Sequence, residues 1–192
     1  MNSNYLTDPI ILVIDSVASL YILAVMLRFL LQWQGAAFYN PISQFLVKVT
    51  HPPLRLLRRF IPPFGKIDTS SLILMLALQI IVNFTILFLQ NVIINIAALT
   101  ILSLSDLFSL LINIFVFAVF ARALLSWITP GAYGGAAASI LTSLTEPLLA
   151  LCRKFIPDFG GIDLSPLAVL LFLQLAKMVI LPPLQELTRL LS

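Results

Sequence analysis

Two charged residues lie inside long apolar runs of this sequence, where an ionisable side chain is costly and marks a functional candidate. Asp15 lies five residues into the first run, and Lys177 lies twelve residues after Ser165, which begins the last run. At about 1.5 Å per residue, Asp15 lies about 7 Å and Lys177 about 12 Å from the same membrane surface. We expect the two side chains either to form an ion pair between the first and last apolar segments or to reach that surface separately. A third alternative is a role in transport.

Four further charged residues occur in pairs near the other ends of the apolar runs. Arg28 and Arg122 lie near the ends of two runs, while Asp68 and Asp163 each stand two residues before a serine that begins the next run. An acidic residue there complements the dipole of the helix that follows. Arginine suits a carboxylate because its guanidinium can donate two parallel hydrogen bonds. We therefore expect each arginine to bond the aspartate of its own half of the chain or, alternatively, to reach lipid phosphates.

The sequence holds no pattern typical of catalysis, of cofactor binding or of a metal site. It contains no phosphate-binding loop, no Ser-His-Asp set and no pair of acids placed for acid–base work. One histidine, His51, and one cysteine, Cys152, are too few for a metal cluster. We expect His51 to lie in a solvated loop and Cys152 to fill apolar space. The sequence therefore predicts a protein that is not an enzyme and that holds no cofactor or metal.

Neutral polar residues at or near membrane depth form a further group of candidates. They are Gln79, Asn83, Asn91, Asn95, Asn113 and Gln174. Such residues usually hydrogen-bond between helices, which is our expectation, although they could also line a narrow pore.

The chain is a tandem repeat, and its most specific part is a short segment rich in basic residues and proline. Residues 51–68 and 146–163 align at an offset of 95, and Arg28 to Trp33 aligns with Arg122 to Trp127 at an offset of 94. The matching candidates, first copy with second, are Arg28 with Arg122, Trp33 with Trp127, Arg58 with Arg153, Arg59 with Lys154, and Asp68 with Asp163. So many scarce residue types at nearly the same offset indicate two copies of one structural unit.

The composition indicates an integral membrane protein. Hydrophobic residues make up 60% of the chain and charged residues 10%, against about 45–50% and about 25% in ordinary soluble domains. A span needs about 20 apolar residues, and four segments are long enough. The predicted spans are residues 10–33, 70–90, 104–127 and 165–185. We predict an all-α fold of two parallel two-span repeats.

Each predicted repeat also carries an amphipathic segment between its two spans. The first repeat covers 1–90 with this segment at 41–61, and the second covers 104–192 with it at 136–156. Residues 91–103 are then a linker, expected to be interfacial or a helical extension and not a fifth span. Pro52 and Pro53 should interrupt the first amphipathic helix, because proline donates no amide hydrogen bond and clashes with the preceding turn.

The basic residues predict the orientation of the chain. Nine of the eleven Lys and Arg residues lie in the two basic segments or at the span ends that lead into them. The positive-inside rule then places both basic segments in the cytoplasm and both termini outside. There the arginines and lysines would face anionic lipid. The segments are too short and too apolar to predict nucleic-acid binding.

The doubled motif Arg-x-x-Leu-x-Trp, Thr-x-Pro-Leu, Arg-(Arg/Lys)-Phe-Ile-Pro and Gly-x-Ile-Asp resembles the YggT family of small membrane proteins. The motif occurs at Arg28 to Trp33 with Thr50 to Ser70, and again at Arg122 to Trp127 with Thr145 to Ser165. The resemblance implies a bacterial inner-membrane or plastid protein linked to cell division, to assembly of membrane complexes or to osmotic tolerance. It implies no catalytic residues.

Two functions agree with these features. The first is a scaffold or assembly factor in the bacterial inner membrane that binds anionic lipid and either membrane-protein partners or further copies of itself. The alternative is a small channel or transporter component that affects ion or osmotic balance. The residues expected to carry either role are the matched pairs together with Asp15 and Lys177.

Overall fold

The computed structural model describes residues 4–36, 39–65, 67–128, 135–155 and 163–191. Within these ranges the chain forms helices and a single isolated β-bridge, between Phe64 and Ile67. The helices are α1 (Asn4–Trp33), α2 (Pro41–Leu57), α3 (Thr69–Leu89), α4 (Ile96–Ile128), α5 (Ala136–Arg153) and α6 (Ser165–Leu191). The predicted all-α fold is confirmed.

Four of the described helices are long and apolar enough to cross a membrane. They are Thr7–Trp33, Thr69–Leu89, Ile96–Ser126 and Ser165–Leu191. Many of their large apolar side chains are exposed on the outside of the bundle, Leu12, Phe84 and Phe172 among them. An outward-facing apolar surface of this extent is typical of helices that contact lipid, so the prediction of a multi-pass membrane protein is confirmed.

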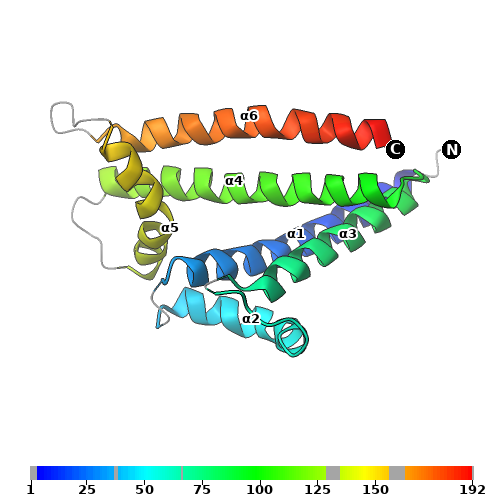
Figure 1. Cartoon of the computed structure of the whole chain (residues 1–192), viewed down its shortest axis with the longest axis horizontal. Coiled ribbons are helices and arrows are strands. Elements are labelled where there is room, and N and C mark those ends of the chain that lie inside the picture. Colours follow the sequence, from blue (N-terminus) through cyan, green and yellow to red (C-terminus); the bar gives the residue numbers. More distant parts are fainter. Residues whose placement is uncertain (1–3, 37–38, 66, 129–134, 156–162, 192) are drawn as a thin grey trace.

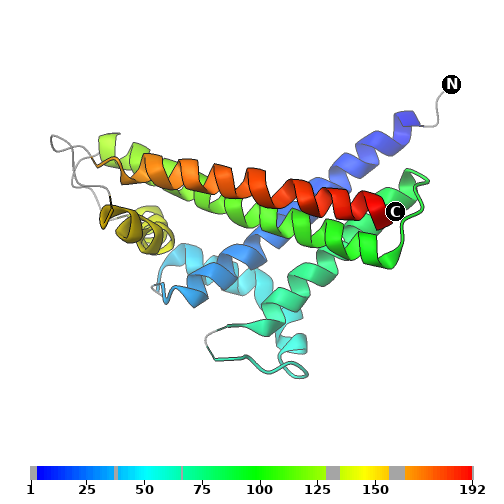
Figure 2. The ribbon, with the colours of Figure 1, turned by 45° about the horizontal axis from the view of Figure 1, so that its top comes forward.

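The helices are arranged so that the two short ones lie at one end of the molecule. Figures 1 and 2 show α4 beside α6, and α1 beside α3, while α3 also packs against α4. Figure 1 places α2 and α5 at the end opposite the two chain termini. We call the end that carries α2 and α5 the basic end, because Lys48, Arg55 and Arg59 are exposed there.

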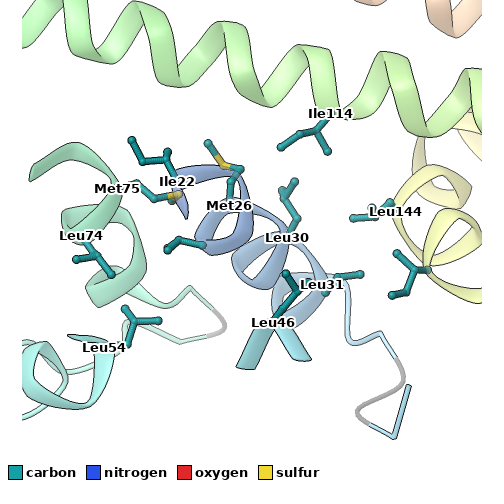
Figure 3. Close-up of a cluster of buried hydrophobic side chains, with 12 residues drawn as sticks. Ile22, Met26, Leu30, Leu31, Leu46, Leu54, Leu74, Met75, Ile114 and Leu144 are labelled. Carbon is teal, nitrogen blue, oxygen red and sulfur yellow. The ribbon is translucent and has the colours of Figure 1, made fainter. Parts of the chain in front are cut away.

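Two clusters of buried apolar side chains hold this arrangement together. In the larger one, Ile22 and Leu30 of α1 contact residues of α2 and α3, and Ile114 and Leu144 join it from the second repeat (Figure 3). The smaller cluster lies between α4, α5 and α6, around Val119. Each repeat therefore has its own core, and the first core extends into the second repeat.

The predicted start of the third span, at about residue 104, is wrong, because α4 begins at Ile96. Residues 96–103 of the predicted linker thus form a helical extension, which was one of its two expected conformations. The sequence from 96 to 103 has no glycine or proline that would end a helix. Asn95 starts the helix by accepting a hydrogen bond from the amide of Ala97 at 2.6 Å. The turn between α3 and α4 is made at Asn91, which has φ 58°. Residues 96–103 are thus the first part of the third span.

The expected interruption at Pro52 and Pro53 is also wrong. Helix α2 continues through both prolines to Leu57, which places His51 in a helix and not in a loop. Thr50 and Leu54, on either side of the prolines, are both fully buried. Packing on both sides therefore offsets the two missing amide hydrogen bonds.

Several helix ends also differ from the predicted ones. Helices α2 and α5 end at Leu57 and Arg153, a few residues before the predicted ends of the amphipathic segments. Helix α1 begins at Asn4 and α6 continues to Leu191, so both outer spans extend beyond their apolar runs. Helix ends are set by caps and by packing, which an apolar pattern does not encode.

Candidate functional site

A buried arginine joins α1 to α2 in the first repeat. Arg28 is 6% exposed and its Nη1 donates to the hydroxyl of Thr50 at 2.8 Å. That hydroxyl in turn donates to the carbonyl of Leu46, one turn earlier in α2, at 2.6 Å. The partner expected for Arg28 was the carboxylate of Asp68, and the structure gives it this hydroxyl instead.

Asp68 forms an ion pair with Arg58, the residue directly after α2. It also accepts a hydrogen bond from the Ser71 hydroxyl, in the first turn of α3, at 2.8 Å. The Asp68 side chain is 2% exposed. Burial alone would raise the pKa of Asp68, but the hydrogen bonds from Arg58 and Ser71 bring the pKa below its ordinary value. The ion pair closes the chain segment between α2 and α3.

The second repeat has the same two contacts and one more carboxylate. Arg122 of α4 donates to the Thr145 hydroxyl at 2.8 Å, as Arg28 does to Thr50, and also to Glu146 at 2.5 Å. Arg153 contacts Glu146 at 3.0 Å and Asp163 at 2.9 Å. Glu146 thus bridges the two arginines of its repeat.

The charges around Asp163 favour its ionised form. Its second carboxylate oxygen accepts from the amide of Ser165 at 2.9 Å, at the start of α6. Burial acts to raise the pKa of Asp163, but the bonds from Ser165 and Arg153 lower it below its ordinary value. For Arg153, burial acts to lower the pKa, and the carboxylates of Asp163 and Glu146 raise it above its ordinary value. The aspartate expected to complement the α6 dipole therefore does so as a backbone cap.

The two clusters differ in net charge because His51 stands at the first-repeat position of Glu146. The first cluster has two guanidinium groups, those of Arg28 and Arg58, against one carboxylate. The second has two guanidinium groups against two carboxylates. With neutral histidine, the first cluster carries an excess of one positive charge and the second carries none.

The other predicted residues at the basic end are exposed. Arg59 and Lys154 face outward, next to the arginines that form the ion pairs. Trp33, at the end of α1, is 50% exposed, and its ring stacks on Phe29 with centroids 6.2 Å apart. The side chain of Trp127 lies outside the described residues. An exposed tryptophan at a span end is typical of a membrane interface.

The proposed pair of Asp15 and Lys177 is not present in the structure. Lys177 of α6 donates to the Asn113 side chain of α4 at 2.8 Å. Asp15 accepts from Ser19, one turn along α1, at 3.4 Å. Figure 1 shows α4 lying between α6 and α1, so the first and last spans do not meet along their length. Lys177 therefore stabilises contacts within the second repeat.

A buried polar cluster that the sequence prediction missed joins the two repeats. Asp106 of α4 accepts from the side-chain amides of Asn83, at 2.8 Å, and Gln79, at 3.3 Å, both on α3. Asn83 also donates to the Ser103 hydroxyl at 3.2 Å. Asp106 was not among the predicted candidates, and it lies two residues after the predicted start of the third span at 104. Since α4 begins at Ile96, Asp106 lies about 15 Å into the helix.

The arrangement of these groups is more typical of structural bonding than of catalysis. In the part of the chain that is described, no three His, Cys, Asp or Glu side chains lie close enough to hold a metal ion. Four arginines bond to threonine or acidic groups of their own repeat: Arg28, Arg58, Arg122 and Arg153. Two guanidinium groups with one carboxylate can nevertheless bind an anion, and the Asp106 cluster can accept a proton or a cation.

Comparison with known proteins identifies the repeat unit. The family model CCB3/YggT matches residues 7–90 and again residues 101–184. An uncharacterized protein of Pseudomonas aeruginosa is 40% identical over 185 residues, which cover 95% of this chain and 93% of the relative. The uncharacterized protein YggT of Escherichia coli K12 is 34% identical over 177 residues, or 90% of this chain and 89% of that protein. No solved structure matches. The two predicted repeats and the resemblance to the YggT family are confirmed.

Proposed function

We propose that this chain, which belongs to the CCB3/YggT family, is a non-enzymatic scaffold or assembly factor of the bacterial inner membrane. In this role it would gather anionic lipid and membrane-protein partners at its basic end. The observation that carries the proposal is the placement of α2 and α5, which lie together at one end and are each bonded to their own spans through a buried threonine. A surface held to the spans in this way is suited to docking.

The faces of α2 support a role at the lipid surface. Its inner face buries Thr50 and Leu54 against the bundle. Its outer face exposes Phe45 together with the basic residues Lys48 and Arg55. A helix with apolar and basic groups side by side lies well in the headgroup region, where anionic lipid attracts the positive charges.

The orientation that we propose has the basic end in the cytoplasm and both termini outside. The support is the distribution of Lys and Arg, since the positive-inside rule counts these residues in short loops next to the spans. A cysteine placed near the N-terminus, in a variant in which Cys152 is replaced by Ala, would report the side. Labelling by a membrane-impermeant maleimide in intact spheroplasts supports this orientation, and labelling only after lysis contradicts it.

The lipid part of the proposal can be tested with tryptophan quenching. In a Trp127→Phe variant, Trp33 is the one tryptophan left, and it lies at the basic end. Brominated phosphatidylglycerol should quench its fluorescence more than brominated phosphatidylcholine with the same acyl chains. Replacing Lys48, Arg55 and Arg59 by glutamine should remove the difference. Equal quenching by the two lipids in the parent protein would contradict anionic-lipid enrichment.

The partner part of the proposal can be tested by photocross-linking in cells. A photoreactive residue at Leu56, on the exposed side of α2, should capture a defined set of membrane proteins or a second copy of the chain. The same residue at Leu171, exposed on α6, is the matched control. Capture confined to lipid at both positions would contradict a scaffold role.

The alternative function, a channel or transporter component, is favoured by the Asp106 cluster. A carboxylate held by amides inside a span is a common element of ion and proton pathways. Potassium and proton flux into liposomes that contain the protein, measured beside empty liposomes, tests this alternative. Flux that is lost in an Asp106→Asn variant would support transport, whereas background flux with correctly inserted protein would leave the scaffold proposal standing.

A further inference from the structure

A pocket of about 500 Å³ lies between α1 and α2 at the basic end. Its polar lining consists of Arg28, Gln32, Ser43, His51 and Arg58. The rest of the lining is small or apolar and includes Leu31 and Val47. Among the described residues that line this pocket there are two guanidinium groups and no carboxylate.

Two buried polar atoms of this pocket have no hydrogen-bond partner among the described residues. They are Nε of Arg28 and the hydroxyl oxygen of Ser43, on side chains that are 6% and 9% exposed. A buried donor without an acceptor is costly, and such groups usually bind water, an ion or a ligand. Both belong to residues that line the same pocket, and both can donate to an anion.

The second repeat indicates what kind of group is absent. There the carboxylate of Glu146 lies between Arg122 and Arg153 and contacts both. At the matching position the first repeat has His51, so its two arginines have no internal carboxylate between them. Asp68 does not replace it, because Asp68 contacts Arg58 from the start of α3 and does not line the pocket.

We propose that this pocket binds a phosphate-type oxyanion, which takes the place that the Glu146 carboxylate holds in the second repeat. Arginine donates in a fork that matches a phosphate group, and Ser43 adds a hydroxyl donor. The neighbouring apolar lining suits a phosphate that carries a glycerol and acyl chains. The ligand is therefore the phosphodiester of an anionic lipid such as phosphatidylglycerol, and free phosphate has the same recognition chemistry. The choice of a lipid rests on the proposed function, whereas the oxyanion site rests on the pocket alone.

The test introduces a carboxylate beside the two arginines of the first repeat by mutation. His51 is exposed, so His51→Glu places an acid at the Glu146 position without disturbing the core. Its matched control is His51→Gln, which removes the imidazole but adds no charge. Binding is measured as the rise in unfolding temperature in neutral detergent when inorganic phosphate or short-chain phosphatidylglycerol is added. Phosphatidylcholine with the same chains is the lipid control.

We expect the parent protein and His51→Gln to be stabilised by the anionic ligands and His51→Glu to bind them about tenfold more weakly or worse. Stabilisation by phosphatidylglycerol beyond that by inorganic phosphate identifies a lipid as the source of the phosphate. Stabilisation by inorganic phosphate alone assigns the site to a soluble anion. Equal responses of His51→Glu and His51→Gln, or no response in the parent protein, would overturn the proposal.

The reverse exchange should create a second site in the other repeat. Glu146→His removes the internal carboxylate, and Ala138→Ser restores the hydroxyl that the first repeat has at Ser43. Native mass spectrometry should then count two retained phosphatidylglycerol molecules where the parent protein retains one. An unchanged count would show that an external anion does not replace the internal one.

These experiments separate failure of the pocket from failure of the proposed function. Replacing Lys48, Arg55 and Arg59 by glutamine alters the outer surface of the basic end and leaves the pocket lining intact. If that variant loses the lipid preference of Trp33 quenching while His51→Glu binds like the parent, the pocket proposal fails and the surface role stands. If His51→Glu loses the bound headgroup while the glutamine variant keeps the lipid preference of Trp33 quenching, the pocket proposal is supported and the proposed role of the outer surface fails.

Discussion

Replacing Asp68 by asparagine tests how far one buried carboxylate stabilises the basic end. Its side chain is 2% exposed and accepts from Arg58 and from Ser71. Asparagine has nearly the same size, so the substitution removes the charge with little change in packing. A hydrogen bond to a charged group contributes about 1.5–3 kcal/mol, and Arg58, which is 36% exposed, can turn toward water in the variant. We therefore expect the free energy of unfolding to fall by about 2 kcal/mol.

The same substitution at Asp163 is the matched control. Asp163 is 37% exposed, and its partner Arg153 is 38% exposed. Ion pairs at that exposure contribute about 0.2–1 kcal/mol. Asparagine also caps a helix as well as aspartate does, so the bond to the amide of Ser165 is retained. The expected loss for Asp163→Asn is about 0.5 kcal/mol.

Reversible unfolding by sodium dodecyl sulfate in mixed micelles, followed by far-UV circular dichroism, measures both losses. The two aspartates occupy equivalent positions in the two repeats, and they differ in how deeply the carboxylate is buried. A loss for Asp68→Asn that is no larger than that for Asp163→Asn would refute the reasoning that burial strengthens the first ion pair.

Three further predictions concern other polar contacts of the bundle, and the same unfolding assay measures them. Thr50→Val removes the hydroxyl that accepts from Arg28 and should lower the free energy of unfolding by about 2 kcal/mol. Thr145→Val should cost less, because Arg122 keeps Glu146 as a partner. Equal losses in the two variants would contradict this reasoning. Asp106→Ala leaves two amide donors without their acceptor and should cost about 1–3 kcal/mol, and Asp106→Asn should cost clearly less. Burial acts to raise the pKa of Asp68, but its hydrogen bonds bring that pKa below the ordinary value in the folded protein. The stability that the Asp68 carboxylate contributes is therefore fully present above the pKa of the unfolded state, and it is lost as the pH falls through the pKa of the folded state. The difference in stability between the parent protein and Asp68→Asn should therefore stay constant above about pH 5 and close in more acid solution; a difference that persists there would contradict an ionised Asp68.

The repeats and the spans could be predicted from the sequence because both leave a pattern in residue type. Apolar runs of sufficient length specify spans regardless of how the helices pack. Matching scarce residues, such as Arg28 with Arg122, specify the repeats. The position of Asp163 at the start of α6 also follows from the pattern, since Ser165 and Pro166 mark a helix start.

The partners of the arginines could not be read from the same pattern. Arg28 and Arg58 both lie near the depth of Asp68, and depth alone does not select which guanidinium reaches the carboxylate. A local signal was present, because Arg58 precedes Asp68 by the same ten residues that separate Arg153 from Asp163. A contact repeated at a fixed short separation favours the local partner over the distant one, since it closes a smaller loop.

The Asp106 cluster was missed because its recognition depends on where a helix begins. Asparagine and glutamine on α3 were expected to bond between helices, and Asn83 and Gln79 do so. Their partner Asp106 was not a candidate, because it lies only two residues after the predicted start of the third span at 104. Eight more helical residues before that point move the carboxylate into the bundle.

Polar contacts join the repeats at both ends of the bundle, and together they limit how the repeats can move. At the basic end, Asn40 caps α2 and also donates to the carbonyl of Ala136, the first residue of α5, at 2.7 Å. Toward the other end, Asp106 of the second repeat accepts from Asn83 of the first. Rocking of one repeat against the other, as in alternating access, would have to break at least one of these contacts. The packing of Ile114 into the core of the first repeat opposes the same motion. These contacts favour the proposed scaffold over a rocking transporter. Because Asn40 and Asn83 lie at opposite ends of the bundle and share no partner, Asn40→Ala combined with Asn83→Ala should lower the free energy of unfolding, in the same assay, by about the sum of the two single losses.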